Sequence, residues 1–186
     1  EIPFEVPKNW VWTRIGSLFN LQSGKFISAS EIHDVPDSIF RYACYGGNGI
    51  RGYADHYNRE GSFPLIGRQG ALCGNINHAD GRFYATEHAI VVEHFCEINI
   101  EWMCYFLSQL NLNQYSTATA QPGLSVTTIN SIPIPLPPHK EQLSIADAIS
   151  HAFTQIDIVE QGKLDLQSII AQTKSKILDL AIRGKL

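Results

Sequence analysis

The period of the hydrophobic positions changes near residue 138 of this 186-residue chain. Before it, runs of β-branched and aromatic residues are separated by turns rich in Gly, Asn and Asp, which is typical of short strands. The runs that predict strands are 40–45, 62–67, 82–86 and 88–93. Residues 13–21 and 100–110 have apolar residues at helical spacing instead, with Thr13 and Asn99 as the expected N-caps. The pattern predicts an α/β (α+β) domain of mixed short strands and helices.

A proline-rich segment follows this domain. Pro133, Pro135, Pro137 and Pro138 remove backbone donors and hold the chain extended, so the segment is expected to be a stiff connector. A helix can begin directly after Pro138, because proline is tolerated in the first helical turn.

Beyond the prolines, apolar residues recur in alternating steps of four and three. The positions are Ile145, Ile149, Ala152, Ile156, Val159, Lys163, Leu166, Ile170, Thr173, Ile177 and Leu180. Only Lys163 and Thr173 among them are not apolar. This repeat of about 3.5 residues is typical of a coiled-coil seam, whereas a straight helix has a period of about 3.6. The alternative is one long helix packed on its own domain. At about 1.5 Å per residue, a helix over 145–180 would be ~50 Å long.

Two glycines bear on the extent of this helix. Gly162, beside Lys163, is expected to weaken the middle and is a candidate break. Gly184 is expected to end the helix, after Arg183 has placed a cation near the carboxyl end.

Charge narrows the classes of function. The formal net charge of −4 argues against a partner that is bound by electrostatics alone. Between residues 41 and 82, however, five arginines face three acidic residues, a local balance of +2. These arginines are Arg41, Arg51, Arg59, Arg68 and Arg82. They are the first candidates to contact a polyanion, and an ordinary solvated surface is the alternative.

The sequence contains neither a run of about 18 apolar residues that could span a membrane nor the pattern of a signal peptide at its start. Its four cysteines, Cys44, Cys73, Cys96 and Cys104, form no C-x-x-C pair. We therefore expect no structural zinc, and free buried thiols in a reducing cytoplasm. Since the chain begins at Glu1 and its one methionine is Met103, we expect it to be part of a longer or processed protein.

Gly47-x-Gly49-x-x-Gly52 has the spelling of a dinucleotide-binding fingerprint. That fingerprint needs a following helix and an acidic residue about 20 positions further on, and the sequence offers neither. We interpret the glycines as a tight irregular loop and expect no cofactor. Phosphate-loop, H-E-x-x-H and G-x-S-x-G motifs are also absent from the sequence. Glu87 and His88 are adjacent, but strand alternation would point them to opposite faces. We expect no catalytic residues.

Side chains that can read DNA lie on glycine-flanked loops instead. Arginine matches the guanine edge and Gln or Asn the adenine edge in the major groove, and lysine can reach a phosphate. The candidates are Lys25, Tyr45, Asn48, Arg51, Tyr53, Arg68 and Gln69. The alternative is that Arg68 makes a salt bridge and Gln69 fills a turn.

The whole chain resembles one half of the specificity (S) subunit of type I restriction–modification systems. The resemblance rests on five stretches in order: EIPFEVPKNWVWTRIGSLF, YGGNGIRGYADHYN, PLIGRQGALCGNINHADGRFYATEHAIVV, GLSVTTINSIPIPLPPHKEQLSIADAI and AIRGKL. In that family a target-recognition domain alternates with a long helix. The helices of two halves pair in an antiparallel coiled coil, and the subunit reads the two half-sites of a DNA sequence without catalysing a reaction.

The resemblance implies that residues 1–138 are a DNA target-recognition domain and 139–186 a dimerising spacer. The implied partners are double-stranded DNA and the methyltransferase and restriction subunits of a cytoplasmic complex. Since one domain and one helix are present, either the chain forms a homodimer or it pairs with the other half of a longer subunit; the missing initiator Met favours a fragment, the second repeat. A coiled-coil adaptor that recognises protein is the main alternative, and an unrecognised enzyme is a third.

Overall fold

The computed structural model describes residues 4–70, 72–116 and 123–185. The chain divides into two compact units, Glu1–Leu143 and Ser144–Leu186. The second unit comprises most of α4 (His139–Ile182) and the residues after it, whereas the first turn of α4 belongs to the first unit. The boundary expected from the sequence, between residues 138 and 139, falls at the start of α4.

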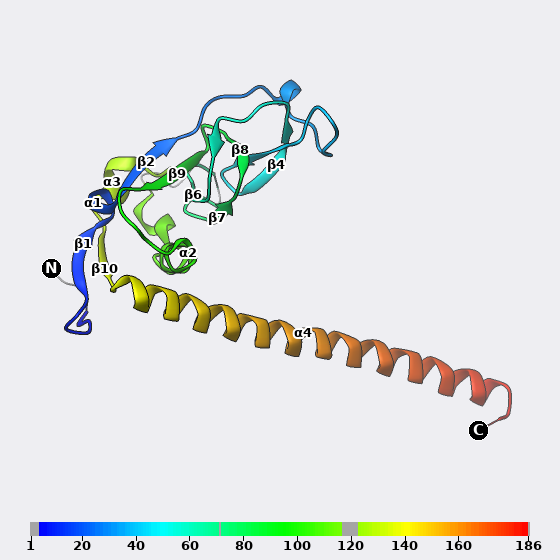
Figure 1. Ribbon diagram of the computed structural model, residues 1–186. Helices are drawn as coiled ribbons and strands as arrows, with labels where there is room; N and C mark the ends of the chain where they lie inside the picture. Colours follow the sequence, from blue (N-terminus) through cyan, green and yellow to red (C-terminus); the bar gives the residue numbers. More distant parts are fainter. Residues whose placement is uncertain (1–3, 71, 117–122, 186) are drawn as a thin grey trace. The chain divides into compact units, whose positions relative to one another are not determined.

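Two four-stranded sheets form most of the first unit (Figure 1). One has the order β2 (Phe19–Ser23), β9 (Ala89–His94), β6 (Phe63–Gly67) and β7 (Ile76–Ala79), and all its neighbours are antiparallel. The other has the order β4 (Gly49–Ala54), β3 (Tyr42–Gly46), β8 (Arg82–Ala85) and β5 (Arg59–Glu60), with β3 and β8 parallel. The chain passes from the second sheet to the first in the short turn between β8 and β9. The four strand predictions from the sequence are confirmed as β3, β6, β8 and β9.

The core fills both faces of β8. Phe83 packs in a buried cluster with Leu65, Ala79, Ala85 and Val91. Tyr84, the next residue, points to the opposite face and packs in a second buried cluster with Ile27, Cys44 and Ala54. Since successive side chains of a strand alternate between faces, β8 is buried on both sides. This strand therefore gives the turn that follows it a rigid base.

The proline segment is a strand. β10 (Pro133–Leu136) pairs antiparallel with β1 (Val11–Arg14), from Val11 opposite Leu136 to Arg14 opposite Pro133. Ile15 donates its backbone N–H to Ile132 O at 3.1 Å just beyond the pair. By alternation the backbone N–H groups of Ile134 and Leu136 then point to β1. The nitrogens of Pro133 and Pro135 point to the open edge, where a missing donor costs nothing. The proline segment is extended as predicted, but it is a strand of the first unit and not a separate connector.

The prediction of a helix over residues 13–21 is mostly wrong. Only α1 (Ile15–Leu18) is helical, and β1 and β2 flank it directly. Arg14, not the expected Thr13, is the N-cap. Ile15 and Leu18 are buried, so the helical spacing of apolar residues reflects two buried positions on one short turn. Pairing of the flanking segments with distant strands overrides the local helical pattern.

The helix expected at 100–110 is confirmed as α2 (Ile100–Gln109). The Asn99 side chain caps it by accepting a hydrogen bond from the backbone N–H of Trp102 at 2.7 Å. Trp102, Met103 and Leu107 are buried, so the apolar stripe forms part of the core. The remaining short helices of the first unit are η1 (Ala29–Glu31), η2 (Leu112–Tyr115) and α3 (Val126–Asn130).

The first turn of α4 is tied to three other segments of the first unit. Gln142, 2% exposed, accepts a hydrogen bond from the Asn99 backbone N–H and donates one to Pro137 O, both at 2.9 Å. Trp10 donates its indole N–H to the Glu141 carboxylate at 2.7 Å. These bonds hold the first turn of α4 within the first unit, because buried polar groups that lose their partners are costly.

α4 is continuous for 44 residues, through both Gly162 and Lys163. The break expected at Gly162 is wrong, because nothing there opposes the helical conformation. Gly184 ends the helix as expected, with φ of 64°, and its N–H donates to Ala181 O while the N–H of Lys185 donates to Leu180 O. This is the Schellman arrangement that satisfies the last carbonyls of a helix.

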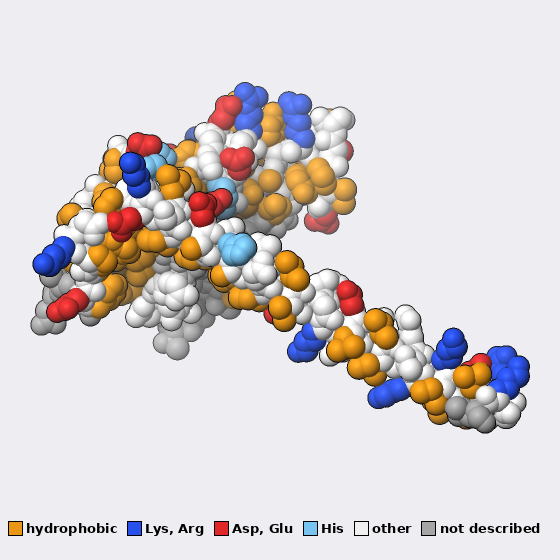
Figure 2. Space-filling model, turned by 60° about the horizontal axis from the view of Figure 1, so that its bottom comes forward, with side chains coloured by type: hydrophobic (Ala, Val, Ile, Leu, Met, Phe, Trp, Pro, Cys, Tyr) orange, Lys and Arg blue, Asp and Glu red, His pale blue; other side chains and the backbone are white. Residues whose placement is uncertain are grey.

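The large apolar side chains of the predicted seam are exposed along the second unit. Ile156, Val159 and Leu166 are 51%, 70% and 57% exposed, and Ile170 and Ile177 are 45% and 48% exposed. Figure 2 shows hydrophobic side chains spread along α4 between charged ones. A row of this length in contact with water is energetically unfavourable, and a second helix is the natural cover for it.

All four cysteines are free thiols. Cys44 and Cys73 are buried as expected, but Cys104 is half-buried and Cys96 is exposed. Burial raises the pKa of both Cys44 and Cys104 to about 11. Because the thiolate is the reactive form, these two thiols are poor nucleophiles near neutral pH.

Candidate nucleic-acid interface

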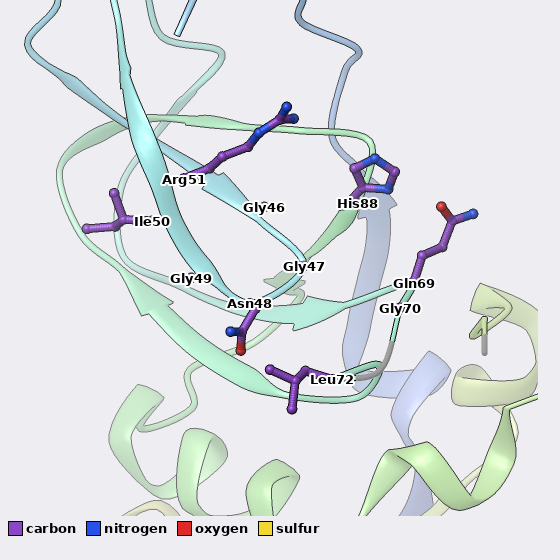
Figure 3. A pocket seen from close by; sticks show the side chains of 10 residues that line it. All are labelled: Gly46, Gly47, Asn48, Gly49, Ile50, Arg51, Gln69, Gly70, Leu72 and His88. Carbon is purple, nitrogen blue, oxygen red and sulfur yellow. The ribbon is translucent and has the colours of Figure 1, made fainter. Parts of the chain in front are cut away.

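Three loops of the first unit enclose an open cavity of about 670 Å³ (Figure 3). They are the turn between β3 and β4, the segment after β6 and the turn between β8 and β9. The lining residues are Gly46, Gly47, Asn48, Gly49, Ile50, Arg51, Gln69, Gly70, Leu72 and His88. The two glycine-flanked loops that the sequence analysis selected separately are therefore neighbours in space.

The first loop is the tight turn of a β-hairpin. Gly46 pairs with Gly49, and Gly47 and Asn48 form the two-residue connection. Gly49 has φ of 98°, which residues with a side chain rarely adopt. The glycines thus bend the chain, as interpreted from the sequence, in a tight hairpin whose register shifts between Cys44 and Tyr45. No helix follows them, since Gly49 and Gly52 lie in β4 and the next element is β5.

The second loop, which follows β6, passes very close to the backbone of the hairpin turn. A Cβ added to Gly67, at the end of β6, would lie 2.0 Å from the carbonyl oxygen of Gly47. Gly67 also donates its N–H to Asn75 O and accepts one from Gly74, both at 2.8 Å, which closes the segment 67–75 on itself. Only glycine allows this approach, which sets the width of the cavity.

Gly67→Ala is therefore expected to open the cavity and destabilise the domain. The added methyl group meets backbone on a packed strand, so the chain must shift, at a cost of about 1–3 kcal/mol. We expect a melting temperature lower by about 2–10 °C, measured by differential scanning calorimetry. Gly46→Ala is the matched control, because its Cβ would meet only ordinary contacts, the nearest at 3.8 Å. Equal melting temperatures for the two variants would contradict the argument.

Three of the seven predicted DNA-binding residues line the cavity. Arg51 is exposed, and its guanidinium has no hydrogen bond or ion pair among the described residues. Gln69 is also exposed, and within the described ranges its side-chain amide is likewise unpaired. Asn48 accepts a hydrogen bond from the Asn75 amide at 2.8 Å. Figure 3 shows the side chains of Arg51 and Gln69 extending to the side on which His88 lies.

The other four predicted residues do not line the cavity. Arg68 donates to Ser23 Oγ at 3.2 Å, and Tyr45 packs edge-to-face on Phe83 in the core. Tyr53 is half-buried, and its backbone forms a bridge with His33. Lys25 is exposed beside Thr86, at the base of the β8–β9 turn. What separates the two groups is how three loops that are distant in the sequence pack together, which sequence reasoning could not supply.

The remaining arginines of the 41–82 stretch are engaged with protein groups. Arg82 pairs with Glu60 at 3.0 Å, and the bond to this carboxylate raises the pKa of Arg82. Arg41 contacts the Tyr42 ring and hydroxyl. Arg59 donates to the Gln22 amide oxygen at 3.0 Å. Among the described residues, Arg41, Arg51 and Arg68 of this stretch form no ion pair, and of these three only Arg51 lines the cavity.

Glu87 and His88 were misplaced by sequence reasoning. They lie in the turn between β8 and β9, where strand alternation does not apply. The imidazole Nε2 of His88 is 3.2 Å from Glu87 Oε1, so the two side chains meet instead of pointing apart. His88 also lines the cavity, which no sequence signal indicated.

Within the described part of the chain, no cluster of three or more His, Cys, Asp or Glu side chains could hold a metal ion. None of the helices described is both long and apolar enough to cross a membrane.

A family model for the type I restriction modification DNA specificity domain matches residues 7–167. The chain belongs to this family, as the resemblance indicated.

Among curated proteins, the type I restriction enzyme EcoprrI specificity subunit of Escherichia coli is 40% identical over 154 residues, which cover 80% of this chain and 38% of that protein. The chain is also similar to the solved structure of the HsdS subunit from Thermoanaerobacter tengcongensis, with a TM-score of 0.72 at 17% identity over 100% of this chain and 48% of that one. The S subunit structure from M. genitalium has a TM-score of 0.68 at 20% identity over 83% of this chain and 42% of the other. These structures support the fold, a mixed α/β domain with a long C-terminal helix. The chain spans less than half the length of each relative.

Proposed function

We propose that this chain is a sequence-reading half of a type I specificity subunit. The first unit reads one half-site of a bipartite DNA target through the loops around the cavity, and α4 pairs with a second helix of the same kind. The observation that carries the proposal is the cavity rim, where Arg51 and Gln69 stand exposed without partners among the described residues. Family membership supplies the context in which this rim faces DNA.

The rim has the mixture of groups that the major groove requires. Arginine pairs with O6 and N7 of guanine, and glutamine or asparagine pairs with N6 and N7 of adenine. Ile50 and Leu72, each 54% exposed, can contact the methyl group of thymine. Lys25 and Arg68 would then contact phosphates around the site. Tyr45 and Tyr53 would pack beneath the hairpin and hold it in place.

α4 is proposed to pair along the seam that Ile145, Ile149, Ala152, Ile156, Val159, Leu166, Ile170, Ile177 and Leu180 form. The partner helix comes from a second copy or from the other half of a longer subunit. A dimer with two-fold symmetry would bind a palindromic, interrupted site. The ~50 Å of helix against roughly 34–36 Å per DNA turn suggests half-sites about one turn apart or somewhat more.

The net charge of −4 fits a subunit that works inside a complex. We propose that the chain itself is not catalytic and that methyltransferase subunits, joined by a restriction subunit for cleavage, dock on it. These subunits would supply much of the attraction to phosphate, so the isolated chain is expected to bind DNA weakly and with strong dependence on salt. Such a complex would be cytoplasmic.

The proposal is tested by selection from random duplex DNA, with the protein assembled with the methyltransferase subunit of its own system. Enrichment of a short motif inverted about an unselected spacer would support both readout and helix pairing. Enrichment of a single half-site would keep readout and reject the symmetric dimer. If the complex enriches nothing at low salt, the proposal fails and the adaptor alternative takes its place.

A further inference from the structure

The turn between β8 and β9 places His88 at the cavity, and its backbone is held from three sides. His88 O accepts the backbone N–H of Arg68 at 2.8 Å, and its own N–H points to Thr86 Oγ1 at 3.3 Å. Thr86 is fully buried and donates its backbone N–H to Tyr45 O at 2.9 Å. A Cβ on Gly47 would come within 3.3 Å of His88 O. All three loops therefore meet at this residue, and its Cα has little freedom to move.

The side chain of His88 is oriented by its neighbour. Its Nε2 lies 3.2 Å from Glu87 Oε1, while the other carboxylate oxygen, Oε2, is buried and has no hydrogen-bond partner among the described residues. An unsatisfied buried oxygen costs free energy and calls for an explanation beyond packing. The contact of Oε1 with the imidazole is the polar contact that the carboxylate makes here, and Oε2 remains unsatisfied beside it.

The ring has one nitrogen left for a ligand. A carboxylate oxygen 3.2 Å from a ring nitrogen favours the proton on that nitrogen, so Nε2 is taken as the protonated one. In the neutral imidazole, Nδ1 is then an acceptor. Of the groups that bases present in the major groove, the exocyclic amines of adenine and cytosine are the donors that match it.

We infer that His88 reads a base with an exocyclic amine, adenine or cytosine, and that Glu87 is the positioning residue that makes its free nitrogen an acceptor. The inference rests on the proposed DNA readout and adds a third loop to it. Arg51 and Gln69, which extend to the same side of the hairpin in Figure 3, would contact neighbouring positions of the same half-site.

The test is the same selection, repeated with variants of these two residues. His88→Ala is expected to reduce discrimination at one base position by roughly five- to tenfold, the effect of one lost hydrogen bond, and to leave the other positions unchanged. His88→Asn is expected to retain most of the preference, because its amide oxygen stands close to where Nδ1 was. Glu87→Gln can donate to Nε2 and so turn Nδ1 into a donor. It is expected to admit guanine or thymine at that same position, a change that a purely structural role would not produce.

Two substitutions serve as matched controls. His94→Ala removes an exposed imidazole at the far end of β9, and Glu101→Gln removes an exposed carboxylate from α2. Neither residue lines the cavity, so both variants should select the motif of the unaltered protein. If the unaltered protein selects a motif and His88→Ala selects it equally well, or loses affinity evenly at all positions, the inference is overturned while the proposed function stands. If the unaltered protein selects nothing, the proposed function fails first.

Discussion

Ile156→Asp should convert the proposed dimer of this chain into a monomer. Ile156 lies in the middle of the predicted seam and is 51% exposed in the single chain. Pairing would bury it in both copies, and burial of an isoleucine side chain contributes about 1.5–3 kcal/mol. An unpaired carboxylate in an apolar seam adds a further penalty. The combined loss of roughly 4 kcal/mol or more corresponds to a dissociation constant about a thousandfold weaker.

The measurement is light scattering after size exclusion at tens of micromolar, with helix content checked by circular dichroism. Ile158→Asp is the matched control. It makes the same change two residues away, at a side chain that is 59% exposed but lies off the seam. The control should remain a dimer. A monomeric unaltered chain would reject the dimer itself, and a dimeric Ile156→Asp variant would place the interface elsewhere on α4.

Arg51→Ala is expected to remove discrimination at one base pair of the half-site. A well-placed arginine–guanine contact contributes about 1–3 kcal/mol, so the preference should fall by roughly 5- to 150-fold at that position. Arg51→Lys separates the two ways in which an arginine can act. Lysine retains the charge but cannot form the bidentate pair, so it should rescue general affinity without rescuing the base preference. Competition binding against single-base variants of the selected motif gives both quantities.

Arg82→Ala is the matched control for Arg51→Ala, because it removes the same charge. Arg82 belongs to the same arginine-rich stretch, but it is paired with Glu60 at 3.0 Å. Its loss should leave the motif unchanged. An Arg51→Ala variant that weakens all sequences equally and lowers the salt dependence by about one unit would show a phosphate contact instead. An Arg51→Ala variant that binds like the unaltered protein would favour the adaptor alternative.

Sequence patterns predicted well the elements that depend on local spacing. α2 followed from its apolar stripe and Asn99 cap, and α4 from the long repeat and the terminal Gly184. Both hold because neighbouring turns of one helix supply the contacts that stabilise it. Arg51 and Gln69 were selected from the chemistry of glycine-flanked loops and both line the cavity, although nothing in the sequence showed that the two loops meet. Their contact with DNA stays a prediction.

The errors concern segments whose partners are distant in the chain. Residues 13–21 have helical spacing, yet Val11 and Phe19 pair with Leu136 and His94, and those distant strands decide the conformation. Glu87 was assigned to a strand because its neighbours are β-formers. The chain changes sheet at that point and needs a turn, a requirement that only the three-dimensional arrangement contains.

The pairing of β1 with β10 brings the two ends of the strand-rich part of the first unit to one place. Val11 and Leu136 are opposite each other although 125 positions separate them along the chain. A unit with adjacent ends can be inserted between flanking segments or removed from them without altering their separation. A different domain with the same two end strands could therefore be joined to the same helix, and under the proposed function this would give a new specificity.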